Sequence, residues 1–270
     1  MIALVTGASR GVGKGIALAL GDAGATVYVT GRTTAASAPT TSLPGTIDET
    51  AADVTARGGK GIALQCDHRD DDAVRRVFQG IDHLDLLVNN AWGGYELLHE
   101  GDYEGFTAPF WEAPLGMWDG MFDAGVRAQY AATRLAVPLM ADGGLIVNIS
   151  SFAAKSPKEV VALGVAKGAT DRLTQLAAEQ LRDRKIAVVS LYPGLVRTEG
   201  ILKWKDYIDL SNSESPWFVG RAVAALAADS DVLDKSGEVL VVAELAEKYG
   251  FSDEDGAQPR SLRADFEGVR

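Results

Sequence analysis

A glycine-rich turn close to the first residue limits the folds that this chain can adopt. Residues 2–6 form a short apolar run that is typical of a buried parallel strand, and Gly7-Ala-Ser-Arg-Gly11-Val-Gly13 follows it directly. Residues 14–23 then show helical periodicity, which ends at Gly24. A strand, a glycine turn and a helix in this order are typical of a dinucleotide-binding βαβ unit. The glycines let backbone N–H groups approach phosphate, and the helix N-terminus adds a partial positive charge.

We expect this turn to bind the phosphates of a dinucleotide. A glycine-rich turn can also be purely structural, and the flanking strand and helix favour the binding role. The residues predicted to bind are Gly7, Ser9, Arg10, Gly11, Val12 and Gly13.

Strand and helix patterns alternate along the rest of the chain. Further strands are predicted at residues 26–30, 61–66, 84–88, 145–149, 185–191 and 239–242, and further helices at 47–57, 118–140, 160–181 and 216–228. The alternation predicts an α/β fold, a doubly wound Rossmann-type parallel sheet with helices on both faces. We expect a single domain over residues 1–270, with a mobile lid at about 195–217 and a polar surface tail at 251–270.

Composition and charge exclude several classes of function. The net charge of −11 disfavours nucleic acid and anionic membranes as partners. The chain begins with an apolar strand rather than a secretory leader, and no apolar run reaches the length of a membrane span. The single Cys66 cannot form an internal disulfide, so we expect a cytoplasmic protein. The histidines lack metal-ligand spacing, so no metal is expected, and His68 is expected at the surface.

The second and third strands predict the type of cofactor. The second strand leads into Gly31-Arg32, where an acidic residue would bind the ribose 2′-hydroxyl of NAD. An arginine there suits the 2′-phosphate of NADP, and Arg10 could supply a second positive charge, although both could be solvated surface arginines. The sequence therefore favours NADP(H) over NAD(H). Asp67 follows the third strand and could accept from the adenine amino group or cap the next helix.

The region after the fourth strand is predicted to face the cofactor and the substrate. Asn89-Asn-Ala91 ends that strand, and its amides can tie neighbouring strands together and line the cleft. Residues 92–118 are rich in aromatic side chains, which could form an apolar wall for a bulky small-molecule substrate. The same side chains could instead serve packing or a subunit contact. The aromatic residues are Trp92, Tyr95, Tyr103, Phe106, Phe110, Trp111 and Trp118.

In order and at their spacings, these motifs resemble the short-chain dehydrogenase/reductase (SDR) superfamily over nearly the whole chain. The motifs are Thr6-Gly-Ala-Ser-Arg-Gly-Val-Gly13, Asn89-Asn-Ala91, Ser150-Ser151, Lys167, and Pro193-Gly194 with Thr198. The chain looks closest to the branch named after dehydrogenase/reductase SDR family member 1. The residues behind this likeness are Val27-Tyr-Val-Thr-Gly-Arg32, Phe110-Trp-Glu-Ala-Pro114, residues 220–227 and Ala243-Glu-Leu-Ala.

The resemblance implies an NAD(P)-dependent oxidoreductase and a role for each matching residue. It implies that Lys167 binds the nicotinamide ribose, that Ser151 binds a substrate carbonyl and that Asn90 lies near the adenosine ribose. With Asn90, Ala91 belongs to the implied cofactor site. The residues implied to hold the nicotinamide amide and the phosphates are Pro193, Gly194, Val196 and Thr198. The two long helices, at 118–140 and 160–181, make a homodimer or homotetramer plausible.

Two positions depart from the family pattern. The family has an Asn where this chain has Gly125, and its catalytic Tyr where this chain has Leu163. A leucine neither donates nor accepts a proton. Three interpretations follow: an oxidoreductase whose substrate needs no Tyr or whose acid is Tyr95 or Tyr192, an NADP(H)-binding pseudoenzyme, or a non-redox enzyme in the same cleft. Retention of Ser151 and Lys167 favours the first.

Overall fold

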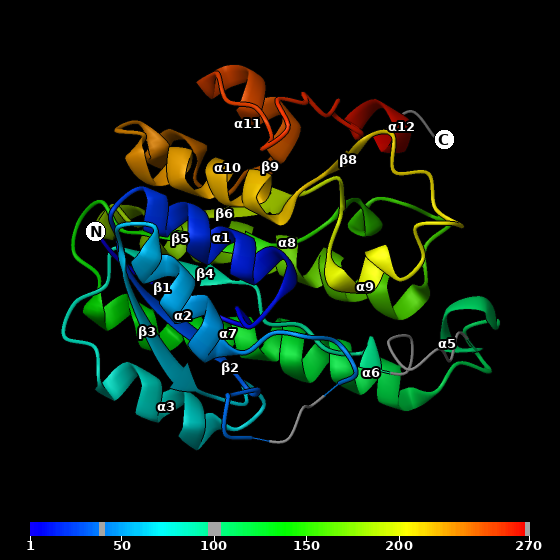
Figure 1. The fold of residues 1–270 in the computed structure, drawn as a ribbon, viewed down its shortest axis with the longest axis horizontal. Helices are drawn as coiled ribbons and strands as arrows, with labels where there is room; N and C mark the ends of the chain where they lie inside the picture. The colour runs from blue at the N-terminus through cyan, green and yellow to red at the C-terminus, as the bar shows by residue number, and fades with distance from the viewer. Residues whose placement is uncertain (38–40, 97–103, 268–270) are drawn as a thin grey trace.

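A seven-stranded parallel sheet forms the centre of the computed structural model, which describes residues 1–37, 41–96 and 104–267. Its order is β3-β2-β1-β4-β5-β6-β9, and every neighbouring pair is parallel. This arrangement confirms the predicted doubly wound fold (Figure 1). The strands are β1 (Ile2–Val5), β2 (Thr26–Gly31), β3 (Lys60–Gln65), β4 (Leu86–Asn89), β5 (Leu145–Ile149), β6 (Ala187–Tyr192) and β9 (Val239–Val241).

Helices cover both faces of the sheet. One face carries α1 (Gly11–Asp22), α2 (Ile47–Ala56) and α10 (Pro216–Ala228). The other carries α3 (Asp71–Gln79), α7 (Ala128–Ala136) and α8 (Val161–Leu181). The alternation along β1 shows why both faces are apolar, since Ala3 and Val5 join the first core while Leu4 joins the second.

The predicted long helix at residues 118–140 is a succession of shorter elements. It comprises α6 (Leu115–Met121), the π-helix η1 (Phe122–Arg127), α7 and the 3₁₀ turn η2 (Val137–Leu139). Gly125 lies within the π-helix, where the ring of Trp92 packs against its Cα and leaves no room for a Cβ. A π-helical turn inside an α-helix frequently marks a functional site, and this one lies beside the candidate site.

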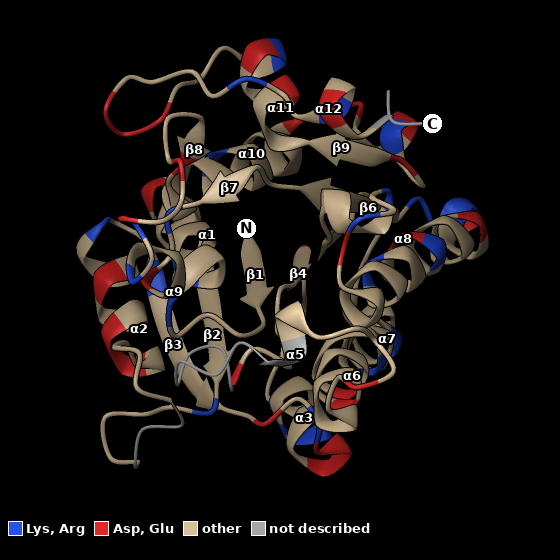
Figure 2. Ribbon diagram, turned by 90° about the vertical axis from the view of Figure 1, so that its right-hand side faces the viewer, with Lys and Arg blue, Asp and Glu red and all other residues tan. Residues whose placement is uncertain are grey.

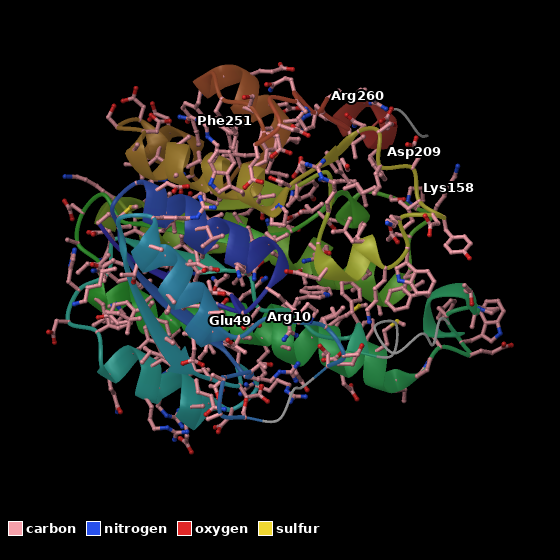
Figure 3. All side chains as sticks on the ribbon, viewed as in Figure 1. Arg10, Glu49, Lys158, Asp209, Phe251 and Arg260 are labelled. Carbon is pink, nitrogen blue, oxygen red and sulfur yellow. The ribbon has the colours of Figure 1, made fainter. Side chains whose placement is uncertain are left out.

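The predicted lid and tail contain short regular elements and buried contacts. The lid region contains β7 (Leu195–Val196), which pairs with β8 (Ser213–Glu214), and the short helix α9 (Glu199–Leu202). In the tail, Asp253 is buried, accepts from the Ser215 N–H at 2.8 Å and forms an ion pair with Arg197. Phe251 is also buried, beside α10 and α11 (Val242–Tyr249) (Figure 3). The expectation of a purely surface tail is therefore wrong for these residues.

The remaining elements are short. They are α5 (Glu104–Thr107), α12 (Arg263–Glu267) and the 3₁₀ turns η3 (Phe152–Ala154), η4 (Arg182–Arg184) and η5 (Val232–Lys235). Figure 2 shows the charged residues on the outer helices and loops, while β1 and β4 carry none. Within the described ranges, no helix has the length and apolarity needed to cross a membrane.

Candidate active site

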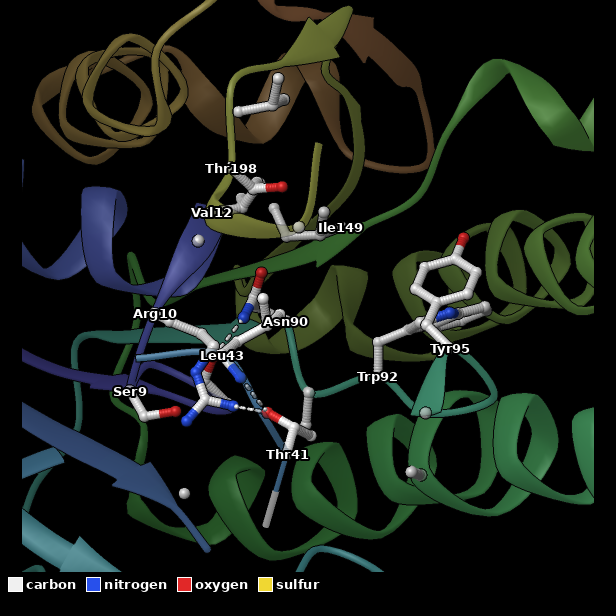
Figure 4. A pocket seen from close by; sticks show the side chains of 18 of the residues that line it. Ser9, Arg10, Val12, Thr41, Leu43, Asn90, Trp92, Tyr95, Ile149 and Thr198 are labelled. Carbon is white, nitrogen blue, oxygen red and sulfur yellow. Dashed lines mark hydrogen bonds between the residues drawn. The ribbon is translucent and has the colours of Figure 1, made fainter. Parts of the chain in front are cut away.

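A cavity of about 470 Å³ opens at the carboxyl ends of the central strands. This edge is where ligands bind in open parallel sheets. Figure 4 shows Ser9, Arg10 and Thr41 at one end, Trp92 and Tyr95 at the other, and Asn90 between them. Of the residues predicted to bind cofactor or substrate, the cavity is lined by Gly7, Ser9, Arg10, Gly11, Val12, Arg32, Asp67, Asn90, Ala91, Ser151, Lys167, Pro193, Gly194, Val196 and Thr198.

Gly13 is the exception among the predicted binding residues, because it does not line the cavity. A Cβ at this position would lie 2.4 Å from both Asn90 Nδ2 and Gly7 O, so close packing behind the turn requires a glycine there. Asn90 Nδ2 donates to Gly7 O at 2.8 Å, and Asn89 Nδ2 donates to Asn148 Oδ1 at 2.8 Å. The predicted role of these two amides in tying neighbouring strands together is confirmed.

The glycine turn already binds a carboxylate from a distant part of the chain. The Gly11 N–H donates to Glu199 Oε2 at 2.9 Å, and Glu199 opens α9 directly after Thr198. A phosphate oxygen would be expected to accept from the same N–H group. The sequence analysis missed Glu199, although an acidic residue immediately after the Pro193-to-Thr198 turn was an available signal.

Two arginines line the cavity, Arg10 in the glycine turn and Arg32 directly after β2. Arg10 Nη2 donates to Gly45 O at 2.8 Å and Arg10 Nη1 donates to Thr41 Oγ1 at 3.0 Å, so its guanidinium anchors the loop beside the cavity. Burial, with the nearby charge of Arg32, lowers the pKa of Arg10, which Glu199 partly offsets. Arg32 faces Glu96 across 3.6 Å. The effect of Arg32 on the pKa of Arg10 shows that the two guanidinium groups lie near each other.

Asp67 and His68 follow β3, and their side chains lie in different surroundings. Asp67 lines the cavity, and its hydrogen bonds from Arg69 lower the pKa of its carboxyl. Asp70 caps α3, so the capping alternative for Asp67 is wrong. His68 is buried beside Thr30, with Nε2 2.8 Å from Thr30 Oγ1, and burial lowers the pKa of His68 to about 4. The expected surface position of His68 is wrong, because its side chain turns inward past the end of β3 toward β2.

Lys167, in the second turn of α8, and Ser151, just after β5, line the cavity. Lys167 Nζ donates to Ile149 O at 3.1 Å. Burial lowers the pKa of Lys167 to about 7, and the neighbouring Asp171 raises it in part. The ammonium is therefore near its titration point at neutral pH, where a group can both donate and accept protons.

Leu163 lies one turn before Lys167 on α8. In the part of the chain that the structure describes, it is not one of the residues that line the cavity. It packs, half-buried, in a small apolar cluster around Met117, Met121 and Ala166, to which Tyr95 also belongs. An apolar side chain at this place contributes packing and no proton donor.

The aromatic segment forms part of the predicted wall. Trp92 and Tyr95 line the cavity, with ring centroids 6.4 Å apart. Phe110 and Trp111 are 63% and 72% exposed, so they do not belong to the wall. Tyr103 and His99 lie outside the described residues.

Of the two tyrosines considered as substitute acids, the structure places only Tyr95 at the cavity. Tyr192 is buried at the end of β6 and does not line the cavity; its hydroxyl donates to Asp171 on α8, and its ring packs edge-on against Phe152 at 5.0 Å. Burial raises the pKa of both hydroxyls well above the ordinary range of a tyrosine. Tyr192 is therefore removed from the candidates, and Tyr95 stays.

Comparison with known proteins supplies the family. The model of the short chain dehydrogenase family matches residues 1–206. The chain belongs to the short-chain dehydrogenase/reductase family. Dehydrogenase/reductase SDR family member 1 from Mus musculus is 38% identical over 277 residues, which cover 94% of this chain and 83% of that protein. These relatives identify the chain as an oxidoreductase of this family and confirm the predicted branch.

Solved structures of the family share the fold. A short-chain dehydrogenase from Mycobacterium thermoresistibile has a TM-score of 0.79 and 25% identity, covering 94% of this chain and 88% of its own. The angucycline C-6 ketoreductase LanV, solved with bound NADP, has a TM-score of 0.71 and 28% identity, covering 89% of this chain and 93% of its own. Members of this family bind a nicotinamide cofactor, and the cavity lies where the family's cofactor site is expected.

Proposed function

We propose that this chain is an NADP(H)-dependent short-chain oxidoreductase that works without the usual tyrosine, on an imine, an enone or a bulky apolar carbonyl compound. The observation that carries the proposal is the hydrogen bond from the Gly11 N–H to the Glu199 carboxylate at 2.9 Å. This bond supports the view that the glycine turn can bind a negatively charged group at the place where a dinucleotide phosphate would bind. The NADP bound to LanV is consistent with the same cofactor here.

The residues around the cavity fit such a cofactor. Arg10 in the glycine turn and Arg32 after β2 line the cavity and would face a 2′-phosphate, and Lys167 would hold the nicotinamide ribose. Ser151 would donate to the reacting group of the substrate. Once bound, the cofactor supplies or accepts the hydride.

The choice of substrate class follows from the missing proton donor. Reduction of a ketone adds a hydride to carbon and a proton to oxygen, and Leu163 cannot provide that proton. Hydride addition to an iminium carbon yields the amine with no proton delivered to oxygen. In conjugate reduction of an enone, the proton goes to a carbon and can come from another direction. Trp92 and Tyr95 supply an apolar wall that suits bulky or aromatic compounds.

The competing functions are a cofactor-binding pseudoenzyme and a non-redox enzyme. The observation that favours them is the packing of Leu163 within an apolar cluster, which leaves no hydroxyl at its position. NADPH consumption against a panel of ketones, cyclic imines and enones separates the oxidoreductase from both competing functions. Turnover of any member supports the oxidoreductase, whereas tight NADPH binding with no turnover across the panel rejects it.

Arg32→Ala is expected to weaken NADPH binding by about 10- to 100-fold, because a charge-assisted contact to phosphate contributes about 1.5–3 kcal/mol. NADH carries no 2′-phosphate, so its affinity should change little. Isothermal titration calorimetry with both cofactors measures the two effects. Arg182→Ala, an exposed arginine away from the cavity, is the matched control. An unchanged NADPH dissociation constant in Arg32→Ala would remove the 2′-phosphate assignment.

Glu199→Gln is expected to tighten NADPH binding by about 3- to 10-fold, since the wild-type carboxylate occupies the Gly11 N–H and repels a pyrophosphate. The amide keeps the size of the side chain and removes the charge. Titration at two salt concentrations should show a smaller gain at high salt, where charges are screened. The exposed Glu247→Gln serves as control, and weaker binding in Glu199→Gln would mean that the carboxylate helps to hold the cofactor.

Homo-oligomer formation is proposed through α7 and α8. Val161, Val165 and Leu176 on α8 are 44%, 47% and 47% exposed, and Tyr130 on α7 is 58% exposed. Apolar side chains grouped on exposed helices are typical of subunit interfaces. Sedimentation velocity should report a dimer or tetramer, and Val165→Asp should shift it toward the monomer. A monomer at micromolar concentration would contradict the proposal.

A further inference from the structure

Trp92 lies between two positions that distinguish this site. Its indole ring is in contact with Lys167, whose Nζ is 3.5 Å from the ring centroid. The ring also packs on Gly125, where a Cβ would lie 2.6 Å from Cζ3 and 2.8 Å from Cε3 of the ring. Trp92 follows Asn90 and Ala91 at the end of β4 (Figure 4), so one residue joins the cofactor side of the cavity to the π-helix.

The ring and the glycine depend on each other. Real Cβ atoms do not come within 3.0 Å of a neighbour, so any side chain at position 125 would push the indole away. With glycine, the ring fills the space above the π-helix and presents its face to the cavity. The close packing of the indole on Gly125 therefore affects the contact between the indole and Lys167, which lies on a different helix.

The contact with Lys167 has two opposing effects on its charge. The ring helps to bury Nζ, which favours the neutral amine. Its electron-rich face attracts the ammonium, which favours the charged form. The other polar contacts are the Ile149 carbonyl, 3.1 Å from Nζ, and the charge of Asp171 one turn later on α8, whose carboxylate accepts from Tyr192 on β6.

We propose that Trp92 is a positioning residue for Lys167, that its indole face holds the ammonium against the Ile149 carbonyl, and that Gly125 is required to admit the ring. The ammonium then has a fixed place at the cavity wall without a polar side chain from position 125. The catalytic meaning of this contact rests on the proposed function, whereas the contact itself exists in the protein without cofactor or substrate.

The test compares two replacements of similar size that differ in their π face. In Trp92→Phe and Trp92→Leu, the pKa of Lys167 is measured by NMR of ¹³C-labelled lysine in the cofactor-free protein, with Lys167→Met to assign the signal. Both variants open a similar space, so solvation of Nζ changes similarly in the two. We expect an acid dissociation constant about 3- to 10-fold larger in Trp92→Leu, because only the phenyl ring still stabilises the charged form. Equal constants, or a smaller one in Trp92→Leu, would overturn the proposal.

Gly125→Ala tests the second half of the proposal without touching Trp92. The added methyl group should displace the indole and change the pKa of Lys167 from its wild-type value, because the burial of Nζ and its contact with the ring face both depend on the position of the indole. Gly168→Ala, a glycine of α8 with open space at its Cβ, is the control and should leave the signal unchanged. A Gly125→Ala protein that folds and keeps the wild-type Lys167 titration would contradict the role of the glycine.

Activity then separates this proposal from the proposed function. If the chain reduces a member of the substrate panel, the pH profile of kcat should shift with the Lys167 titration in each Trp92 variant. If the Lys167 titration shifts in the Trp92 variants but no form of the protein turns over any substrate, the contact between Trp92 and Lys167 would be upheld and the oxidoreductase function would be rejected. A shifted titration with an unshifted kcat profile would reject the positioning role in catalysis.

Discussion

Leu163→Tyr is expected to raise ketone reduction by about 10²- to 10⁴-fold, the usual contribution of a positioned general acid. Residues four apart on a helix share a face, so the new phenol would lie beside Lys167 on α8. The ammonium of Lys167 would stabilise the phenolate and lower the pKa of the introduced hydroxyl. NADPH consumption with a panel of bulky aromatic ketones measures the gain.

The matched control is Leu163→Phe, which introduces the same ring without the hydroxyl. It should bring no gain, because Leu163 packs in an apolar cluster that a phenyl ring can join but that supplies no proton. Equal gains in both variants would point to packing rather than proton donation. A Leu163→Tyr protein that binds NADPH and reduces no ketone would mean that the cleft has diverged at more than this position.

Lys167→Met is expected to lower activity by about 10²-fold or more and, at the same time, to raise the free energy of unfolding at pH 7 by about 2–4 kcal/mol. Burial lowers the pKa of Lys167 from its ordinary 10.5 to about 7. Between these values the unfolded chain binds more protons than the folded one, so wild-type stability rises with pH across this window. Methionine keeps the apolar stem and removes the charge whose burial opposes folding.

Urea unfolding at pH 7, 8.5 and 10 tests this prediction. The stability advantage of Lys167→Met should be largest at pH 7 and decrease as the pH approaches 10.5, where the unfolded wild-type chain also loses its proton. The exposed Lys158→Met should change stability by no more than about 0.5 kcal/mol at any of these pH values. A destabilised Lys167→Met protein would show that the contacts of Nζ outweigh the penalty of burying its charge.

Much of the architecture was predictable because it is encoded locally. The first βα unit, the positions of β5 and α8, and the helix at residues 216–228 follow from apolar periodicity and from glycine or proline at their ends. The long helix at 118–140 was predicted without its π-helical turn. That turn contains Gly125, against which Trp92 packs, and no periodicity within the helix reveals this contact.

The sequence motifs predicted which residues belong to the candidate site. They predicted far less about the contacts that these residues make. Arg10 was predicted as a phosphate ligand, yet its guanidinium also holds the loop around Thr41 and Gly45. Tyr192 looked as available as Tyr95, since both adjoin motifs at strand ends. Only the direction of each side chain separates them, because Tyr192 turns toward Asp171 and Tyr95 toward the cavity.

The sequence by itself determined the family, the order of strands and helices, and the absence of a tyrosine four residues before Lys167. These properties depend on residue types at short, fixed spacings. The tertiary structure decided that Glu199 reaches Gly11 across 188 residues, and that Trp92 covers Lys167 while resting on Gly125. Such contacts depend on how the ends of separate strands and helices meet over the sheet, and spacing along the chain carries no information about distances of this kind.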